Sequence, residues 1–310
     1  MFVQSTRIKG FDVSRISLGT VQLGLDYGIS NSGGKPHRED AFKILDCAAK
    51  NGISVFDTAA AYGDAEEVIG AWKKQTEEKC PIIVTKALKL NHSSYETLLE
   101  SLRKRIEESK KRLGVSQIPV LMLHHYEDFE NDEKNIMRAF KELKASGDIL
   151  LSGISLYSNH DYKKVAECGF DAVQIPMNIF DWKQIENGGI NALNETGMMV
   201  FVRSVFLQGL VFKNPDELSN GMSFCRKPLE DFRGLCKEFG MTPASLALSF
   251  ALSVPGVTSL VLGGETVRQV EENVELAKKV TELSSTQMER IHSFFSDIDN
   301  RVINPNLWGV

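Results

Sequence analysis

Short apolar runs alternate with amphipathic stretches along almost the whole chain. Eight runs of four or five mainly apolar residues are too short for helices and are rich in β-branched residues, which is typical of buried strands. We therefore predict strands at residues 16–19, 53–56, 82–85, 120–123, 150–154, 172–175, 198–202 and 259–262.

Segments of helical length separate these runs. In AFKILDCAAK, AEEVIGAWKK and YETLLESLRKRIEESKKRL, apolar residues recur three or four positions apart, as in a helix with one buried face. Alternating strands and helices predict an α/β fold, either an open doubly wound sheet or a closed barrel. The glycines of GTVQLG do not form the GxGxxG motif of a doubly wound dinucleotide-binding sheet. Eight strands without that motif favour a (β/α)8 TIM barrel, and no linker-like segment divides residues 1–310, so we expect a single domain.

Composition narrows the classes of function. The chain has 310 residues, of which 42% are hydrophobic and 25% charged, an ordinary globular composition. A net charge of −5 without a basic block does not favour nucleic-acid binding. We expect no membrane span, because no apolar run reaches about 18 residues. The N-terminus lacks an apolar signal core, and the 5 cysteines form no CxxC pair, so we expect free thiols and a cytoplasmic protein.

Chemically active residues stand at the ends of successive predicted strands. Three of these strands lead to Asp57, Lys86 and His124, and Tyr62 lies in the loop after Asp57. In a barrel all strand ends open on one face, so these side chains are expected to converge. A phenol has a reference pKa of about 10 and is a weak acid, but a neighbouring cation strengthens it. Lys86 could be that cation, held by Asp57, while His124 binds a substrate oxygen. The set suits protonation of a carbonyl oxygen.

Each residue alone has a plainer interpretation. Asp57 could cap the next helix, Lys86 could form a salt bridge at the barrel rim, and Tyr62 could be a packing residue. His124 and His125 face opposite ways in an extended run, so one of them could be structural. The interpretation as a catalytic set therefore depends on all four residues meeting.

The motifs that carry these residues resemble those of the aldo-keto reductases. FDTAAAYGDAEEVIG resembles the family's segment around its aspartate and tyrosine, IIVTK its lysine strand, and LGVSQIPVLMLHH its histidine strand. The likeness continues through GISLYS, DAVQIPMN and PGVTSLVLGGETVRQVEENV, over nearly the whole chain. It implies a barrel that binds NADPH across the strand ends, transfers hydride to an aldehyde or ketone, uses Tyr62 as proton donor and needs no metal.

The resemblance also implies a cofactor site. Ser155 and Gln174 stand where the family holds the nicotinamide carboxamide, and Gln269 and Asn273, four apart on one helical face, stand near the adenine. A loop glycine such as Gly209 lets the backbone approach the pyrophosphate closely. The full set of expected cofactor-binding residues is Gly19, Thr20, Asp57, Ser155, Gln174, Arg203, Leu207, Gly209, Gly263, Arg268, Gln269 and Asn273.

Several positions depart from the family pattern. Leu156 replaces a frequent asparagine, and Arg203 replaces a frequent tyrosine that stacks on the nicotinamide. Arg203 could pair with a cofactor phosphate or cap the ring with its planar guanidinium. Near the ribose, Glu265 stands where many members have a cation, and Arg268 is the remaining nearby cation. We expect NADP by family habit, with NAD possible.

The expected partner is a small carbonyl compound. The residues expected to contact it are Tyr27, Tyr62, His124, His125 and Trp182. His125 replaces a bulky apolar residue common in the family, and GTVQLGLDYGISN resembles reductases of sugar metabolism, so we favour a sugar-like substrate. The alternative function is a cofactor-sensing barrel subunit of a larger assembly with little turnover. No metal is expected, since His124, His125 and Asp128 are poorly spaced for one.

Overall fold

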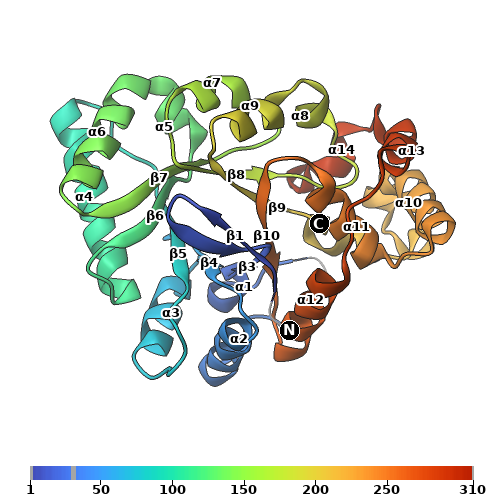
Figure 1. Cartoon of the computed structure of the whole chain (residues 1–310), viewed down its shortest axis with the longest axis horizontal. Coiled ribbons are helices and arrows are strands. Elements are labelled where there is room, and N and C mark those ends of the chain that lie inside the picture. The colour runs from blue at the N-terminus through green and yellow to red at the C-terminus, as the bar shows by residue number, and fades with distance from the viewer. Residues whose placement is uncertain (1–2, 29–32, 309–310) are drawn as a thin grey trace.

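Eight parallel strands close into a barrel at the centre of the molecule (Figure 1). The structure is a computed structural model that describes residues 3–28 and 33–308. The strand order around the barrel is β10-β3-β4-β5-β6-β7-β8-β9. The strands are β3 (Ile16–Gly19), β4 (Val55–Asp57), β5 (Ile82–Ala87), β6 (Ile118–Leu123), β7 (Ile149–Ser155), β8 (Ala172–Pro176), β9 (Met199–Arg203) and β10 (Val257–Gly263). Each overlaps a run predicted above, and the (β/α)8 TIM barrel is confirmed.

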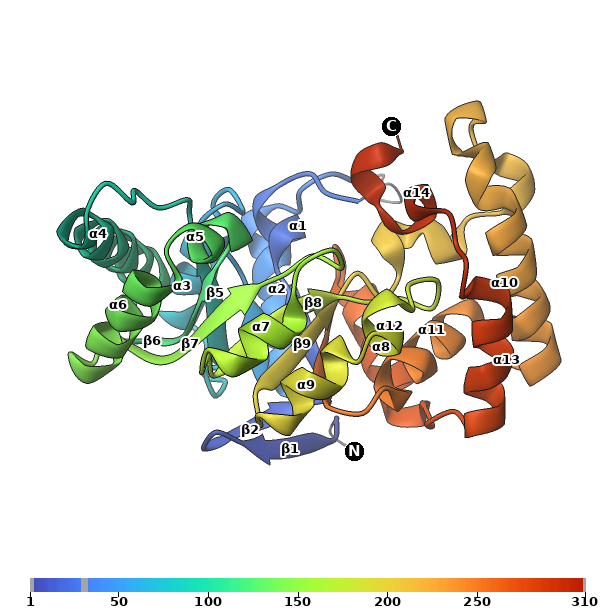
Figure 2. The same ribbon diagram turned by 90° about the horizontal axis from the view of Figure 1, so that it is seen from above.

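Helices surround the barrel (Figures 1 and 2). The helices that follow the strands are α1 (Val21–Gly24), α2 (Arg38–Lys50), α3 (Ala65–Lys73), α4 (Tyr95–Leu113), α5 (Tyr126–Asn131), α6 (Glu133–Ala145), α7 (Tyr162–Glu167), α8 (Lys183–Glu186), α9 (Gly189–Glu195), α11 (Pro243–Ser253) and α12 (Val267–Lys279). The three clearest predicted helices correspond to α2, α3 and α4. Helix α4 begins at the Ser94 cap, whose side chain accepts from the Thr97 N–H, and ends at Gly114 in a left-handed conformation.

Further elements extend the barrel at two places. Helices α10 (Arg226–Phe239) and α13 (Ser285–Phe295) pack together beyond one side of the barrel, as Figure 2 shows. The hairpin of β1 (Ser5–Ile8) and β2 (Phe11–Ser14), which the sequence did not predict, lies outside the barrel sheet. The remaining short elements are α14 (Asn300–Ile303), η1 (Leu207–Phe212), η2 (Pro215–Glu217), η3 (Asn220–Cys225) and η4 (Pro305–Leu307).

Alternating side chains of the strands build two buried layers. Val55, Val84 and Val120 belong to a small cluster inside the barrel, which also includes Val13 of the hairpin. Neighbours such as Phe56 point the other way and join the larger core between strands and helices. In this arrangement every strand presents its carboxyl end on one face, where the polar residues gather. Within the described residues, no helix is both long and apolar enough to cross a membrane.

Candidate active site

Three adjacent strands deliver the predicted catalytic residues to one point. Asp57 ends β4, Lys86 lies near the end of β5, and His124 directly follows β6. The Lys86 Nζ donates to Asp57 Oδ1 at 2.7 Å and to the Thr58 carbonyl at 3.0 Å, and it lies 3.5 Å from the Tyr62 hydroxyl. The structure therefore brings Asp57, Tyr62 and Lys86 together at the strand ends, with Lys86 at the centre.

Lys86 is held as a buried cation. Its side chain is 0% exposed, and burial alone would lower its pKa. The charge of Asp57 and the bonds to Asp57 and Tyr62 outweigh that effect and raise the pKa of Lys86 above its ordinary value. Asp57 also accepts a hydrogen bond from Gln174 Nε2 at 2.7 Å, which fixes the carboxylate. The Tyr62 hydroxyl thus faces a cation that stays charged at neutral pH.

His124 completes the set as a neutral imidazole. Its ring meets that of Tyr62 edge to face, with centroids 6.0 Å apart. Burial, followed by the positive charges of Lys86 and other neighbours, lowers the pKa of His124 to about 3. Its Nδ1 is buried without a partner among the described residues, which favours the tautomer that carries the proton on Nε2. In that form His124 is a hydrogen-bond donor for an oxygen placed beside Tyr62.

The low pKa of His124 has a measurable consequence. Because the imidazole stays neutral above about pH 4, the pH dependence of kcat/KM between about pH 5 and 8 should contain no titration of His124. We expect the profiles of the wild type and of His124→Asn to differ by a constant factor across this range. If the ratio of the two kcat/KM values instead changes with pH near the usual pKa of histidine, His124 does titrate in this range.

A cleft of about 490 Å³ extends from Asp57 and Tyr62 along the strand ends to the start of α12. It passes the loop after β9, where Ser204, Leu207, Gln208 and Gly209 all have positive φ, between 47° and 95°. Such strained backbone is concentrated at ligand-binding positions, where it brings main-chain groups close to a ligand. The volume lies within the usual range for small-molecule and cofactor sites.

Most of the expected cofactor residues border this cleft. Those that line it are Gly19, Thr20, Asp57, Arg203, Leu207, Gly209, Gly263, Gln269 and Asn273. Ser155 ends β7 and is paired in register with Gln174 of β8, and both are buried. The Gln174 Oε1 has no hydrogen-bond partner in the described part of the chain, so it is free to accept from an amide such as the nicotinamide carboxamide. The donors and acceptors present therefore fit a nicotinamide cofactor.

Three expected cofactor residues do not line the cleft: Ser155 and Gln174, which are buried, and Arg268, which is exposed. The Arg268 side chain is 86% exposed and forms an ion pair with Glu272, with Nε 2.8 Å from Oε1. The cleft wall at this end contains Glu265 and Glu272 instead. Burial raises the pKa of Glu265, although the hydrogen bond with Gln269 opposes this. The ribose end of the cleft is thus lined by carboxyl groups.

The expected substrate residues divide into two groups. Tyr27 and Tyr62 line the cleft, whereas His124 and His125, whose rings lie 5.5 Å apart, are not among its lining residues. Trp182 differs from expectation, since it is 7% exposed and its ring packs on Phe250 at 5.1 Å. Its indole N–H donates to the Ile179 carbonyl. The side chain is therefore part of the core packing and does not line the cleft.

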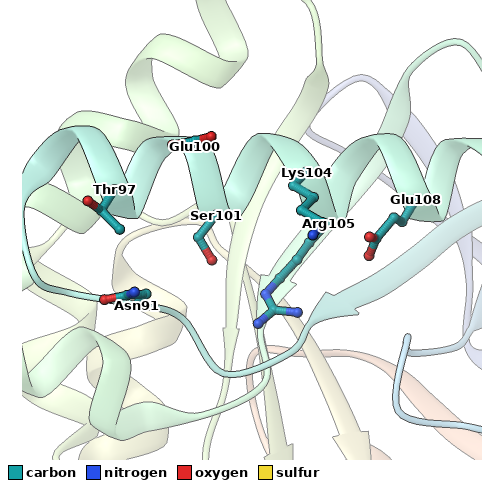
Figure 3. A pocket seen from close by; sticks show the side chains of 7 residues that line it. All are labelled: Asn91, Thr97, Glu100, Ser101, Lys104, Arg105 and Glu108. Atoms are coloured by element: carbon teal, nitrogen blue, oxygen red, sulfur yellow. The ribbon is translucent and has the colours of Figure 1, made fainter.

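Some residues that line the cleft were not predicted. Glu272 lies three residues after Gln269 on α12, so helical spacing could have identified it. Gln22 and Phe212 also line the cleft, and their sequence surroundings contain no comparable signal. A separate hollow beside α4 is lined by Asn91, Thr97, Glu100, Ser101, Lys104, Arg105 and Glu108 (Figure 3). It lies outside the barrel and contains none of the catalytic candidates.

Comparison with known proteins identifies the family. The family model "Aldo/keto reductase family" matches residues 15–295. The NADH-specific methylglyoxal reductase of Escherichia coli is 26% identical, over 84% of this chain and 89% of its own length. L-galactose dehydrogenase of Arabidopsis thaliana is also 26% identical, over 91% of this chain and 88% of its own length. An aldo-keto reductase of Bacillus halodurans, solved in its holo form, superposes with a TM-score of 0.76 at 21% identity, over 97% of this chain and 100% of that one. The chain belongs to the aldo/keto reductase family of oxidoreductases.

Proposed function

We propose that the protein interconverts a carbonyl compound and its alcohol with a nicotinamide cofactor, and that Tyr62 exchanges the proton. One observation carries this proposal. The Lys86 Nζ is fixed by Asp57 at 2.7 Å and lies 3.5 Å from the Tyr62 hydroxyl, in a site closed to solvent around the lysine. A phenol beside a permanent cation is a stronger acid than a free phenol.

Each residue has a separate task in the reduction. Tyr62 gives its proton to the carbonyl oxygen, and the cation of Lys86 stabilises the phenolate that remains. Asp57 keeps Lys86 charged and in place. The neutral His124 donates a hydrogen bond to the same oxygen and orients the carbonyl. A reduced nicotinamide, when bound, supplies the hydride.

The remaining residues would position the cofactor. Ser155 and Gln174 would bind the carboxamide, and the backbone around Leu207 and Gly209 would approach the pyrophosphate. At the adenosine end, two side chains already support the loop after β10. Gln269 Oε1 accepts from the Glu265 N–H at 2.7 Å, and Asn273 Nδ2 donates to the Gly263 carbonyl at 3.1 Å. We propose that these two residues shape the adenosine site and present their free amide atoms to the base.

For the substrate we propose a small polar carbonyl compound, with a sugar as the favoured class. Tyr27 and His125 give the catalytic end of the site aromatic and polar groups, which suit a hydroxylated substrate. Two relatives carry names for such chemistry, one for methylglyoxal and one for L-galactose. Relatives named as reductases and dehydrogenases do not favour the alternative of a cofactor-sensing subunit.

The test is a panel of aldoses, ketoses, methylglyoxal and simple alkyl aldehydes with NADH and NADPH. Loss of the reduced cofactor should depend on both the enzyme and the carbonyl compound, and hydroxylated carbonyls should give the higher kcat/KM. A protein that binds the cofactor tightly but turns over none of these compounds would support the cofactor-sensing role instead.

For the nucleotide we propose NADH, in place of the NADP expected from family habit. An ionised Glu265 beside a 2′-phosphate would cost about 4 kcal/mol at a separation of ~4 Å and an effective dielectric constant near 20. Arg268 cannot offset this while its exposed side chain pairs with Glu272. We expect kcat/KM to favour NADH in the wild type and the preference to weaken in Glu265→Gln.

Arg268→Gln is the matched comparison for that experiment. Because Arg268 lies outside the cleft, the ratio of kcat/KM values for the two nucleotides should change little, and only toward NADH, since Glu272 of the cleft wall loses its counter-charge. A wild-type preference for NADPH that disappears in Arg268→Gln would show that Arg268 turns inward and binds the 2′-phosphate.

A further inference from the structure

Arg203 is a cation in the cleft that has no acidic partner among the described residues. It ends β9 and lines the cleft together with Asp57 and Tyr62. In the described parts of the chain, no carboxylate forms an ion pair with its guanidinium. Asp57 does not compensate it, because that carboxylate is engaged by Lys86. The catalytic end of the cleft therefore carries an excess positive charge, since arginine stays protonated in proteins.

The guanidinium is held in a defined place. Arg203 Nη2 donates to the Leu156 carbonyl at 3.0 Å, and Nη1 lies 3.4 Å from the Ser204 hydroxyl. The guanidinium carbon lies 4.7 Å from the centre of the Tyr157 ring. These contacts extend the side chain from the end of β9 across β8 to the residues that follow β7. It therefore lies at the strand ends that carry Ser155 and Gln174, the proposed carboxamide ligands.

Two departures from the family pattern meet in this contact. Leu156 cannot offer the amide of the frequent asparagine, and its side chain is buried. Arg203, which stands where a stacking aromatic is frequent, bonds to the carbonyl of that same residue. Only some of the five guanidinium N–H groups are used by these bonds, so others are free for a ligand. The two substitutions together replace a neutral amide and a neutral ring by one planar cation.

We infer that Arg203 positions the nicotinamide and makes the cleft bind the reduced cofactor more tightly than the oxidised one. The oxidised ring carries a positive charge and the reduced ring is neutral. A guanidinium against the ring therefore repels only the oxidised form, and in a half-buried site this repulsion is poorly screened. The cleft carboxyl groups Glu265 and Glu272 lie at the other end and do not neutralise Arg203.

The preference for the reduced cofactor favours one direction of the reaction. This inference rests on the proposed nicotinamide-dependent function. An enzyme that holds the oxidised cofactor weakly releases it readily after reduction and resists inhibition by it. Arg203 thus adapts the site to carbonyl reduction rather than alcohol oxidation. The same cation contributes, after burial, Lys86 and His125, to lowering the pKa of His124.

The experiment measures dissociation constants of NADH and NAD⁺ by calorimetry in the wild type and three variants. We expect the wild type to bind NADH at least about tenfold more tightly than NAD⁺. Arg203→Gln should bring the two constants to within about twofold, whereas Arg203→Lys, which keeps the charge, should retain most of the preference. Arg233→Gln is the control, since Arg233 is also half-buried and bonded to a backbone carbonyl, that of Lys213 at 3.1 Å, but lies outside the cleft.

The outcomes separate this inference from the proposed function. Equal affinity of the wild type for NADH and NAD⁺ would overturn the inference and leave the proposed function standing. So would an unchanged ratio in Arg203→Gln with a raised KM for an anionic carbonyl substrate, which would place Arg203 against the substrate. Absence of binding of either nucleotide to the wild type would overturn both. If Arg203→Gln does not fold, Arg203→Met replaces it. The ratio of the NAD⁺ and NADH dissociation constants of the wild type also tests the inference without any variant.

Discussion

Replacing Tyr62 by phenylalanine should lower kcat for carbonyl reduction by about 10²–10⁴-fold, the usual contribution of a positioned general acid. The hydroxyl is the proposed proton donor, and phenylalanine keeps the ring that faces His124 and the Lys86 cation. Steady-state kinetics with a carbonyl substrate identified from the panel would measure the loss. The effect should appear in kcat rather than only in KM, because the proton is transferred in the transition state.

The matched measurement is cofactor affinity. Binding of NADH to Tyr62→Phe, followed by the change in nicotinamide fluorescence, should stay within a few-fold of the wild type, since the proposed carboxamide and pyrophosphate contacts lie elsewhere. A variant with near wild-type kcat would mean that water or another side chain provides the proton.

Removing the carboxylate of Asp57 should destabilise the fold strongly. In Asp57→Ala, Lys86 loses its 2.7 Å partner at a site that is 0% exposed, so it must either hold its charge there without a counter-ion or give up its proton. Breaking one side of a buried ion pair typically costs about 3–5 kcal/mol in the free energy of unfolding. Chemical denaturation with urea would measure this difference at neutral pH.

The pH dependence of this effect has a definite sign. The pKa of Lys86 is higher in the folded protein than in the unfolded chain, where it is about 10.4. The stabilisation from its pairing is therefore complete below the unfolded pKa, and it is lost as the pH rises through the folded pKa. The double variant Asp57→Asn/Lys86→Met removes both charges and should be more stable than Asp57→Ala. A cost below about 1 kcal/mol for Asp57→Ala, as for exposed pairs, would show that water reaches Lys86.

The barrel and the meeting of the candidate catalytic residues could be predicted because their signals are local. Strand runs and amphipathic helices follow from hydrophobic periodicity, which is strong in segments such as α4. The convergence of Asp57, Lys86 and His124 then follows from topology, because parallel strands in a barrel share one carboxyl face. No knowledge of side-chain packing was needed for either step.

The directions of individual side chains could not be predicted from the sequence. Arg268 stands in the expected segment, but its pairing with Glu272 one helical turn later directs it to solvent. Trp182 follows a strand-end loop as expected, but a large apolar ring gains more from packing on Phe250 than from exposure at a cleft. The ion pair and the ring contact depend on three-dimensional neighbours that the residue types alone do not specify.

The most direct test of the central claim follows the hydride and the proton donor together. Wild type and Tyr62→Phe would each be incubated with NADH deuterated at the transferable position and a carbonyl substrate, and the alcohol would be analysed by mass spectrometry. The account predicts one deuterium on the former carbonyl carbon with the wild type and almost no labelled alcohol with Tyr62→Phe over the same time. Oxidation of the cofactor without deuterium in the alcohol, or equally fast labelling by Tyr62→Phe, would contradict it.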